Sequence, residues 1–183
     1  QRVFQSFFLF VMQILVNLTS PHLFQIFTPG VLSLMAVLNV VLPTLSNRFK
    51  SSGMQLLFFL TTLVFLIQFL SPEIQGEGSW ADRVDDSSLS IVLSNLFFTG
   101  TYPLFPWILF AALGATISTS GANKGASVEP INAVRFAIGF GMLFCIVSFY
   151  LAQKNSELWA HPTADATLTF FPANTAFIIA AFT

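Results

Sequence analysis

Charged side chains are scarce in this sequence. Lysine, arginine, aspartate and glutamate together make up 8% of the 183 residues, whereas a typical soluble domain contains roughly 25%. The seven basic and eight acidic residues give a formal net charge of −1. Because nucleic-acid-binding proteins present a basic surface, we expect no nucleic-acid partner.

Cysteine and histidine are also scarce. Cys145 is the single cysteine, so the chain forms neither an internal disulfide nor a thiol cluster for a metal. Each of the two histidines, His22 and His161, neighbours a proline. An imidazole has a pKa suited to acid–base catalysis, but histidines in loops or at interfaces usually contact only water. No phosphate-binding glycine loop, paired-cysteine motif or metal-binding histidine pair occurs, so we expect this chain to hold no metal or cofactor.

Hydrophobic residues dominate what remains. They make up 55% of the chain and include 23 phenylalanines, and the mean hydropathy is +0.77. Several apolar runs approach the roughly 20 residues that one helical membrane span requires. We therefore predict an all-α, polytopic transmembrane helix bundle with five full spans, a truncated sixth and one short interfacial helix. Its partners are expected to be the lipid bilayer and other membrane helices or subunits.

Polar or proline-containing breaks separate the expected spans. The five full spans cover about residues 3–18, 29–45, 54–70, 104–119 and 133–152, and a sixth begins at Ala173. We expect residues 1–183 to form one transmembrane domain that is part of a longer chain.

The segment 71–101 differs from the spans around it because it is acidic. Its carboxylates indicate a solvated loop or, as the alternative, a divalent-cation site, although the spacing of a calcium-binding loop is absent. The second half of the segment has the period of a helix lying on the membrane surface. The expected apolar face holds Leu89, Val92, Leu93, Leu96 and Phe97, and the opposite polar face holds Ser90, Ser94 and Asn95.

Two patterns predict contacts between spans. Gln5, Gln13 and Asn17 lie at helical spacing in the first span, which predicts a polar stripe facing neighbouring helices, with a substrate path as the alternative. Small residues predict a close pairing of the fourth and fifth spans. They are Ala111, Gly114, Ala115 and Ser118 in the fourth span, and Ala137, Gly141 and Cys145 in the fifth.

Basic residues gather on one side of the predicted spans. With five spans, this side holds Arg2, Arg48, Lys50, Lys124 and Arg135, and seven of the eight acidic residues fall on the other side. Cytoplasmic loops of membrane proteins are rich in lysine and arginine. We therefore expect cytoplasmic loops near Arg48/Lys50 and Lys124, an extracytoplasmic acidic loop at 71–101, and a location in a bacterial inner membrane or its equivalent.

Three segments together resemble a known family. Tyr102-Pro103-Leu104-Phe105-Pro106-Trp107, followed by Gly114, is similar to a signature of bacterial membrane acyltransferase-like proteins related to heparan-α-glucosaminide N-acetyltransferase. Gly30-Val31-Leu32-Ser33-Leu34-Met35-Ala36 and Phe170-Phe171-Pro172, the latter followed by Phe177, resemble two further motifs of that family in the same order. The matches extend from about residue 23 to the end.

The resemblance implies an integral membrane transferase. Such a protein passes an acyl or acetyl group from a cytoplasmic acyl-CoA-type donor to an extracytoplasmic acceptor through a histidine in the bundle. That histidine precedes the Gly-Val-Leu helix in the family, and no corresponding stretch precedes residue 23 here. Two other functions stay open, namely a non-catalytic transmembrane subunit of a larger complex, and a transporter whose helix breaks at Pro29-Gly30 and at 103–106 face the substrate.

Two residues are candidates for substrate binding. Arg135 begins the fifth span at the expected cytoplasmic boundary, where a guanidinium binds a donor phosphate or extends to lipid phosphates. Trp107 either lines an acceptor pocket or anchors its helix at the membrane interface.

Overall fold

The computed structural model describes residues 1–48, 53–70, 79–122, 129–162, 166–170 and 173–182, and most of them are helical. The prediction of a helical protein is therefore confirmed. The longer helices are α1 (Arg2–Thr19), α2 (Val31–Arg48), α3 (Gly53–Leu70), α6 (Leu104–Ala122) and α7 (Glu129–Asn155). The shorter elements are α4 (Trp80–Val84), α5 (Leu89–Ser94), a π-helical turn (Asn95–Thr99), β1 (Leu158–His161), β2 (Ala166–Thr169) and α8 (Thr175–Phe182).

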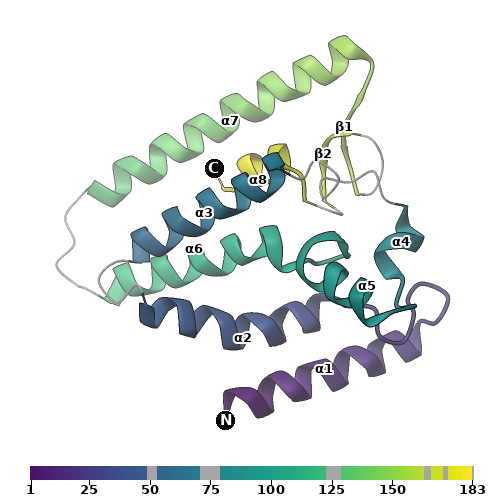
Figure 1. Ribbon diagram of the computed structural model, residues 1–183. Coiled ribbons are helices and arrows are strands. Elements are labelled where there is room, and N and C mark those ends of the chain that lie inside the picture. The colour runs from purple at the N-terminus through teal and green to yellow at the C-terminus, as the bar shows by residue number, and fades with distance from the viewer. Residues whose placement is uncertain (49–52, 71–78, 123–128, 163–165, 171–172, 183) are drawn as a thin grey trace.

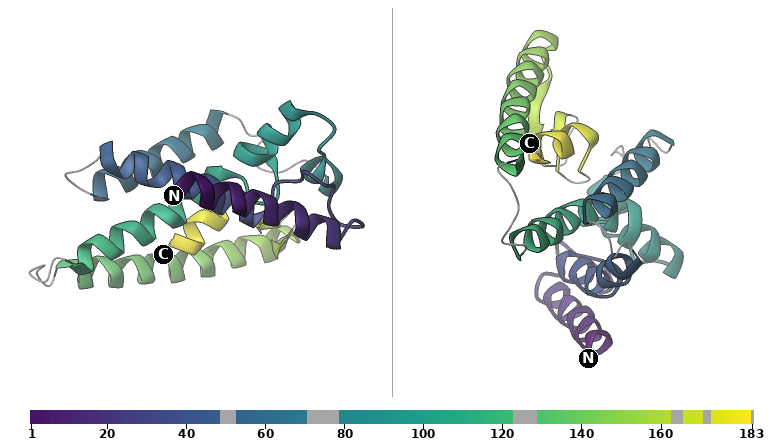
Figure 2. Two further views of the ribbon diagram at one scale, coloured as in Figure 1. Left: turned by 90° about the horizontal axis from the view of Figure 1, so that it is seen from below. Right: turned by 90° about the vertical axis from the view of Figure 1, so that its left-hand side faces the viewer.

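The helices run alternately between two ends of the molecule (Figure 1). One end, called here the N-terminal end, holds the start of α1, the last turns of α2 and α6, and the first turns of α3 and α7. The opposite end, called the loop end, holds the last turn of α1, the α4–α5 region and both strands. α1 packs on α2, α6 packs on α3 and α2, and α7 packs on α8 and β1. α7 stands away from α1, α2 and α3 (Figure 2).

The apolar core lies where α2, α3 and α6 meet. Leu60 and Val64 of α3 pack with Ile108 and Leu109 of α6, and all four side chains are almost fully buried. Ile178 of α8 joins the same cluster. The core thus fixes the positions of α6 and α8, which carry two of the three family-like motifs.

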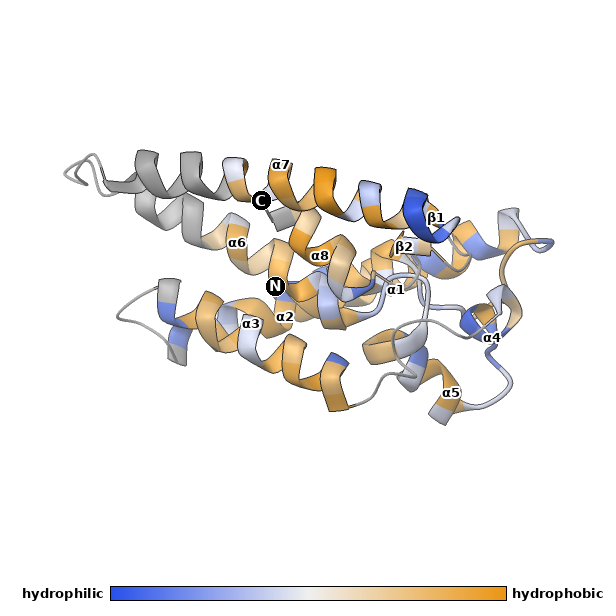
Figure 3. Cartoon of the chain, turned by 90° about the horizontal axis from the view of Figure 1, so that it is seen from above, coloured by the Kyte–Doolittle hydropathy of each residue, from blue (hydrophilic) through white to orange (hydrophobic). Residues whose placement is uncertain are grey.

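α1 buries polar side chains and exposes apolar ones. Ser6, Gln13 and Asn17 are buried, whereas Val3 and Phe4 are 76% and 75% exposed. Hydrophobic residues likewise run along the described part of α7 (Figure 3), and Met142, Leu143 and Ile146 on this helix are exposed. Such a distribution is unfavourable in water, but it is the one expected where lipid contacts the outer faces and polar groups pair inside.

The expectation of five full spans and a sixth is not met by the described residues. α1 and the part of α7 at Ile138–Asn155 are each long and apolar enough to cross a membrane. The apolar stretches of α2 and α3, Val31–Asn47 and Gln55–Leu70, are shorter, and α8 has 8 residues. Polar residues at 46–48 end the apolar stretch of α2 before it reaches the length of a full span.

The predicted surface helix is instead the first half of a bent pair. Leu89–Thr99 and Leu104–Ala115 meet at an angle of 46° and together are long enough for a third span. The break between the two helices spans residues 100–103 and includes Pro103. In the first turn of α6, Phe105, which precedes Pro106, also has an extended backbone with φ −98° and ψ 117°. A residue before proline avoids the helical region, so the sequence itself interrupts the helix here.

The all-α prediction also needs correction. β1 and β2 form a parallel two-stranded sheet in which Leu158 lies opposite Ala166, within the segment expected to be a polar loop. A hydrogen bond of 3.0 Å from Trp159 Nε1 to Ser148 Oγ ties β1 to α7. This contact orients the strand pair against the end of α7.

The predicted pairing of the fourth and fifth spans through small residues is wrong for the described residues. No atom outside the local backbone lies within 4 Å of where a Cβ on Gly114 would stand, so this glycine does not permit a close helix approach. α7 instead turns Gly141, Ser148 and Ala152 inward and packs on α8 and β1. The side chain of Ala137 lies outside the described residues.

Candidate functional site

The three family-like motifs meet at the loop end. Thr101 Oγ1 donates a hydrogen bond of 3.0 Å to the Pro29 carbonyl, which joins the segment before α6 to the Gly30 motif at the start of α2. The ring centroid of Trp107 lies 5.0 Å from that of Phe170, which joins α6 to the third motif. Segments far apart in the sequence therefore form one region.

Five rings form an aromatic cluster around Trp107, made of Tyr102, Trp107, Phe110, Phe170 and Phe177. The centroid of Trp107 lies 5.5 Å from that of Tyr102, 5.3 Å from Phe110 and 6.3 Å from Phe177. Phe170 and Phe177 pack edge to face at 5.2 Å. Centroid separations of roughly 4.5–7 Å are those of favourable aromatic pairs, so the cluster is a rigid apolar unit.

The indole nitrogen of Trp107 is buried within this cluster. Its N–H has no hydrogen-bond acceptor among the described residues. A tryptophan that anchors a helix at a membrane interface keeps this group in contact with water or headgroups. The burial of the nitrogen therefore disfavours the anchor interpretation. Trp107 packs against Phe170 and Phe177 but is not among the residues that line the adjoining groove.

A groove of about 300 Å³ adjoins the aromatic cluster. Phe170 and Phe177 form one part of its lining, and Leu168 and Pro162 form another. His161 at the end of β1 also lines the groove, which places its exposed imidazole next to the aromatic walls. Sequence reasoning gave His161 little weight because it could not place the residue on a strand beside the third motif.

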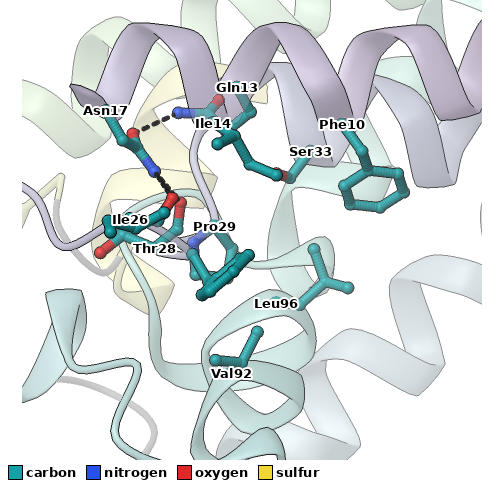
Figure 4. Close-up of a pocket in the computed structure, with 11 residues that line it drawn as sticks. Phe10, Gln13, Ile14, Asn17, Ile26, Thr28, Pro29, Ser33, Val92 and Leu96 are labelled. Atoms are coloured by element: carbon teal, nitrogen blue, oxygen red, sulfur yellow. Dashed lines mark hydrogen bonds between the residues drawn. The ribbon is translucent and has the colours of Figure 1, made fainter. Parts of the chain in front are cut away.

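A polar seam connects α1 with the start of α2 at the same end (Figure 4). Asn17 Nδ2 donates hydrogen bonds to the carbonyls of Ile26 and Thr28, at 3.0 and 2.9 Å. Gln13 Nε2 donates to Asn17 Oδ1 at 2.9 Å, and Gln13 Oε1 accepts from the Leu32 N–H at 3.1 Å. The Leu32 N–H belongs to the first turn of α2, where no carbonyl of the helix is available, so Gln13 caps α2.

The prediction that the polar stripe faces neighbouring helices is confirmed for two of its three residues. Gln13 and Asn17 are buried, whereas Gln5 is exposed. Gly30 lets the seam form, because a Cβ at this position would stand 2.6 Å from Gln13 Nε2. The sequence showed the stripe but not its partner, which is the segment that leads into α2.

α4 is fastened to the π-helical turn by buried polar groups. Arg83 is 4% exposed and donates a hydrogen bond of 3.2 Å to the Thr99 carbonyl. Asn95 Nδ2 donates to the carbonyls of Asp82 and Asp85, at 3.2 and 3.1 Å. Asn95 was expected on a solvated face. Its buried position depends on hydrogen bonds to Asp82 and Asp85, which lie 13 and 10 residues earlier in the chain. Helical periodicity does not reveal contacts with a separate segment.

Two charges of this region are perturbed. Burial lowers the pKa of the Arg83 guanidinium, and the neighbouring Asp82 partly opposes this effect. Hydrogen bonds from the side chain and then the backbone of Ser79 lower the pKa of Asp82. Asp82 thereby completes a capping box at the start of α4.

The acidic residues 82–86 serve the local structure. Asp86 Oδ2 accepts a hydrogen bond of 2.8 Å from the Phe27 N–H, and the Asp86 N–H donates to Gln25 Oε1 at 2.9 Å. Trp80 Nε1 donates to the Leu23 carbonyl at 3.2 Å. Within the described part of the chain, no three His, Cys, Asp or Glu residues are grouped as metal ligands. Glu73 and Glu77 lie outside the described residues.

Two other residues considered from the sequence are His22 and Arg135, and neither is among the described residues that line the groove beside the aromatic cluster. His22 is exposed in the link between α1 and α2 and does not line the groove. Arg135 falls within α7, on the N-terminal half of that helix, and its side chain lies outside the described residues. Its role in binding a donor phosphate therefore stays a prediction.

Comparison with protein-family models, curated proteins and solved structures finds no match for this chain.

We predict that Asn17→Ala destabilises the fold. The substitution leaves the buried Thr28 carbonyl and the partly buried Ile26 carbonyl without this donor, and the loss of a buried partner costs about 1–3 kcal/mol. Denaturant unfolding in detergent micelles, followed by circular dichroism, measures the change. Thr19→Ala is the control on the same helix, because Thr19 is exposed and bonds only to the Val16 carbonyl. Equal stability of the two variants would contradict the role of the seam.

We predict that Trp107→Phe is tolerated and that Trp107→Ala is not. Phenylalanine keeps an aromatic ring in the cluster and removes a buried N–H that has no acceptor among the described residues, whereas alanine opens a cavity at a cost of about 3–5 kcal/mol. Trp159→Phe is the matched control, since it deletes an N–H that does have an acceptor and should cost about 1 kcal/mol. Unfolding in micelles measures all three, and a larger loss for Trp107→Phe than for Trp159→Phe would refute the prediction.

Proposed function

We propose that this chain is the membrane-embedded helical part of an acyltransferase that passes an acyl group from a cytoplasmic donor to an extracytoplasmic acceptor. The observation that carries the proposal is the meeting of three family-like motifs at the loop end. Trp107, Phe170 and the start of α2 belong to different motifs, yet contacts through Thr101 and the aromatic cluster bring them together. A site shared by the three motifs requires contacts of this kind.

The proposed arrangement places the bundle across a bilayer. α1 and the Ile138–Asn155 part of α7 have the length and composition of spans, and α2 and α3 run between the same two ends (Figure 1). α8, with 8 residues, covers only part of that distance. In this proposal the bent pair α5–α6 completes a further pass, and the five passes and the partial sixth retain the predicted separation of charges. The N-terminal end is then cytoplasmic and the loop end extracytoplasmic.

Within this proposal the two ends have different tasks. The groove beside the aromatic cluster receives the acceptor, with Phe170 and Phe177 as apolar walls and His161 as the polar group that orients it. Arg135 binds a phosphate of an acyl-CoA-type donor at the cytoplasmic end. The relay histidine implied by the resemblance is supplied from outside this chain.

A second candidate function is that of a non-catalytic subunit in a larger membrane complex. The exposure of α7 favours it, because Met142, Leu143 and Ile146 are each exposed by 60% or more. Such a surface suits either lipid or another membrane helix. The transporter alternative has no comparable support, since the break at Pro29-Gly30 is filled by Gln13 and Thr101.

We expect labelling to find Lys50 and Asp85 on opposite sides of the membrane. Lys50→Cys and Asp85→Cys would each be made in a Cys145→Ser background and treated in intact cells with a membrane-impermeant maleimide. Asp85→Cys should react at once and Lys50→Cys only after permeabilisation, because the basic end faces the cytoplasm. Glu157→Cys is a second extracytoplasmic reporter. Reaction of Lys50→Cys and Asp85→Cys from the same side would overturn the proposed topology.

We expect membranes that contain the product of the complete gene to transfer radiolabelled acetyl from acetyl-CoA to an amino sugar such as glucosamine. His161→Gln should raise the KM for the acceptor, because the groove loses the group that orients it. His22→Gln, which changes the other proline-adjacent histidine, should leave the kinetics unchanged. Absence of transfer by the complete product, together with its stable recovery in a larger complex, would favour the subunit function instead.

A further inference from the structure

We propose that a crevice between α1 and α5, separate from the acceptor groove, holds part of a phospholipid acyl chain. The crevice has a volume of about 130 Å³ and is partly open. Its apolar lining comes from three segments that are distant in sequence (Figure 4). The residues are Phe10 and Ile14 on α1, Ile26, Phe27 and Pro29 before α2, and Val92 and Leu96 on α5 and the π-helical turn.

The polar residues beside the crevice are engaged elsewhere. Gln13 and Asn17 bond to each other and to the backbone at the start of α2. Thr28 Oγ1 donates to the Val84 carbonyl. Ser33 is the exception among the lining residues, but a helical serine can turn its hydroxyl to a carbonyl of its own helix. No charged residue lines the crevice. The site therefore favours an apolar ligand over an ion or a sugar.

The volume agrees with such a ligand. An engineered apolar protein cavity of about 150 Å³ stays dry and binds benzene, so a crevice of about 130 Å³ accommodates a short stretch of hydrocarbon. Water filling the same space would find few partners for its hydrogen bonds.

The surroundings indicate that the hydrocarbon comes from lipid. Exposed apolar side chains adjoin the lining residues. Leu15 follows Ile14 on α1, Leu93 follows Val92 on α5, and Phe27, which itself lines the crevice, is 59% exposed. This surface faces the bilayer if the chain is embedded as proposed above, and the inference rests on that part of the proposed function. An acyl chain can then enter sideways from the extracytoplasmic leaflet without leaving an apolar environment.

Photolabelling tests this inference on the full chain in vesicles. The probe is phosphatidylcholine with a diazirine on one acyl chain, and mass spectrometry locates the labelled residues. We expect labelling of Phe10, Ile14 and Val92 above the level on the outward-facing Phe7. Val92→Trp should fill the crevice and reduce labelling of Phe10 and Ile14 several-fold. Leu93→Trp, the control one residue along, should not, because Leu93 is 45% exposed.

A second variant distinguishes a filled crevice from a misfolded protein as the cause of reduced labelling. Val92→Ala enlarges the crevice and should preserve or increase labelling of Phe10, with an unfolding midpoint near that of the native chain. Unchanged labelling of Phe10 in Val92→Trp, or labelling of Phe10 no stronger than that of Phe7, would overturn the inference. If the crevice fails this test while Lys50 and Asp85 still label from opposite sides, the membrane proposal survives and the lipid site does not. If the two label from the same side, the membrane arrangement itself fails.

Discussion

The structure depends on one constraint, which is that polar groups surrounded by apolar side chains must pair with one another. Along the contact of α1 with α2, Ser6 Oγ donates to the Ala36 carbonyl at 2.8 Å, and Gln13 and Asn17 continue the same seam. In an apolar solvent, apolar contacts do little to fix how two helices are oriented on each other. Hydrogen bonds between the helices do fix this orientation. The seam therefore sets both the register of α1 on α2 and the course of the link between them.

The same constraint shapes the loop end. The break between α5 and α6 exposes backbone groups that a continuous helix would satisfy, and buried side chains compensate for them. Arg83 donates to the Thr99 carbonyl at the break, and the Thr101 hydroxyl within the break satisfies the Pro29 carbonyl of the link between α1 and α2. Gly100 is required at the break because a Cβ there would stand 2.3 Å from the Asn95 carbonyl oxygen. The family-like motif at 102–107 is thus held in place by residues that lie outside it.

Much of this arrangement could be predicted from the sequence, and the rest depended on contacts without a periodic signal. Apolar runs located α1 and α7, and the spacing of Gln13 and Asn17 revealed a buried stripe. The burial of Asn95 was missed because its partners lie in and just after α4. Helical periodicity shows only which residues of one helix lie on the same face. β1 and β2 were missed because two four-residue strands in a polar segment resemble a loop. For Trp107 the sequence left the choice between anchor and pocket open. Its buried indole nitrogen disfavours the anchor, and it packs against Phe170 and Phe177 without lining the groove.

The geometry also constrains how a transferase built on this bundle would work. The 19 residues of α6 extend about 28 Å at 1.5 Å per residue, and the acceptor groove and the expected position of Arg135 lie toward opposite ends of the bundle (Figure 1). No single side chain covers that distance, so an acyl group handed between the two ends needs a carrier partway along the bundle. The two histidines of this chain lie at 22 and 161, both at the loop end, and neither can serve as that carrier. A transferase therefore requires a relay group from another segment or subunit, and the apolar faces of α1 and α7 are the surfaces on which such a segment would pack.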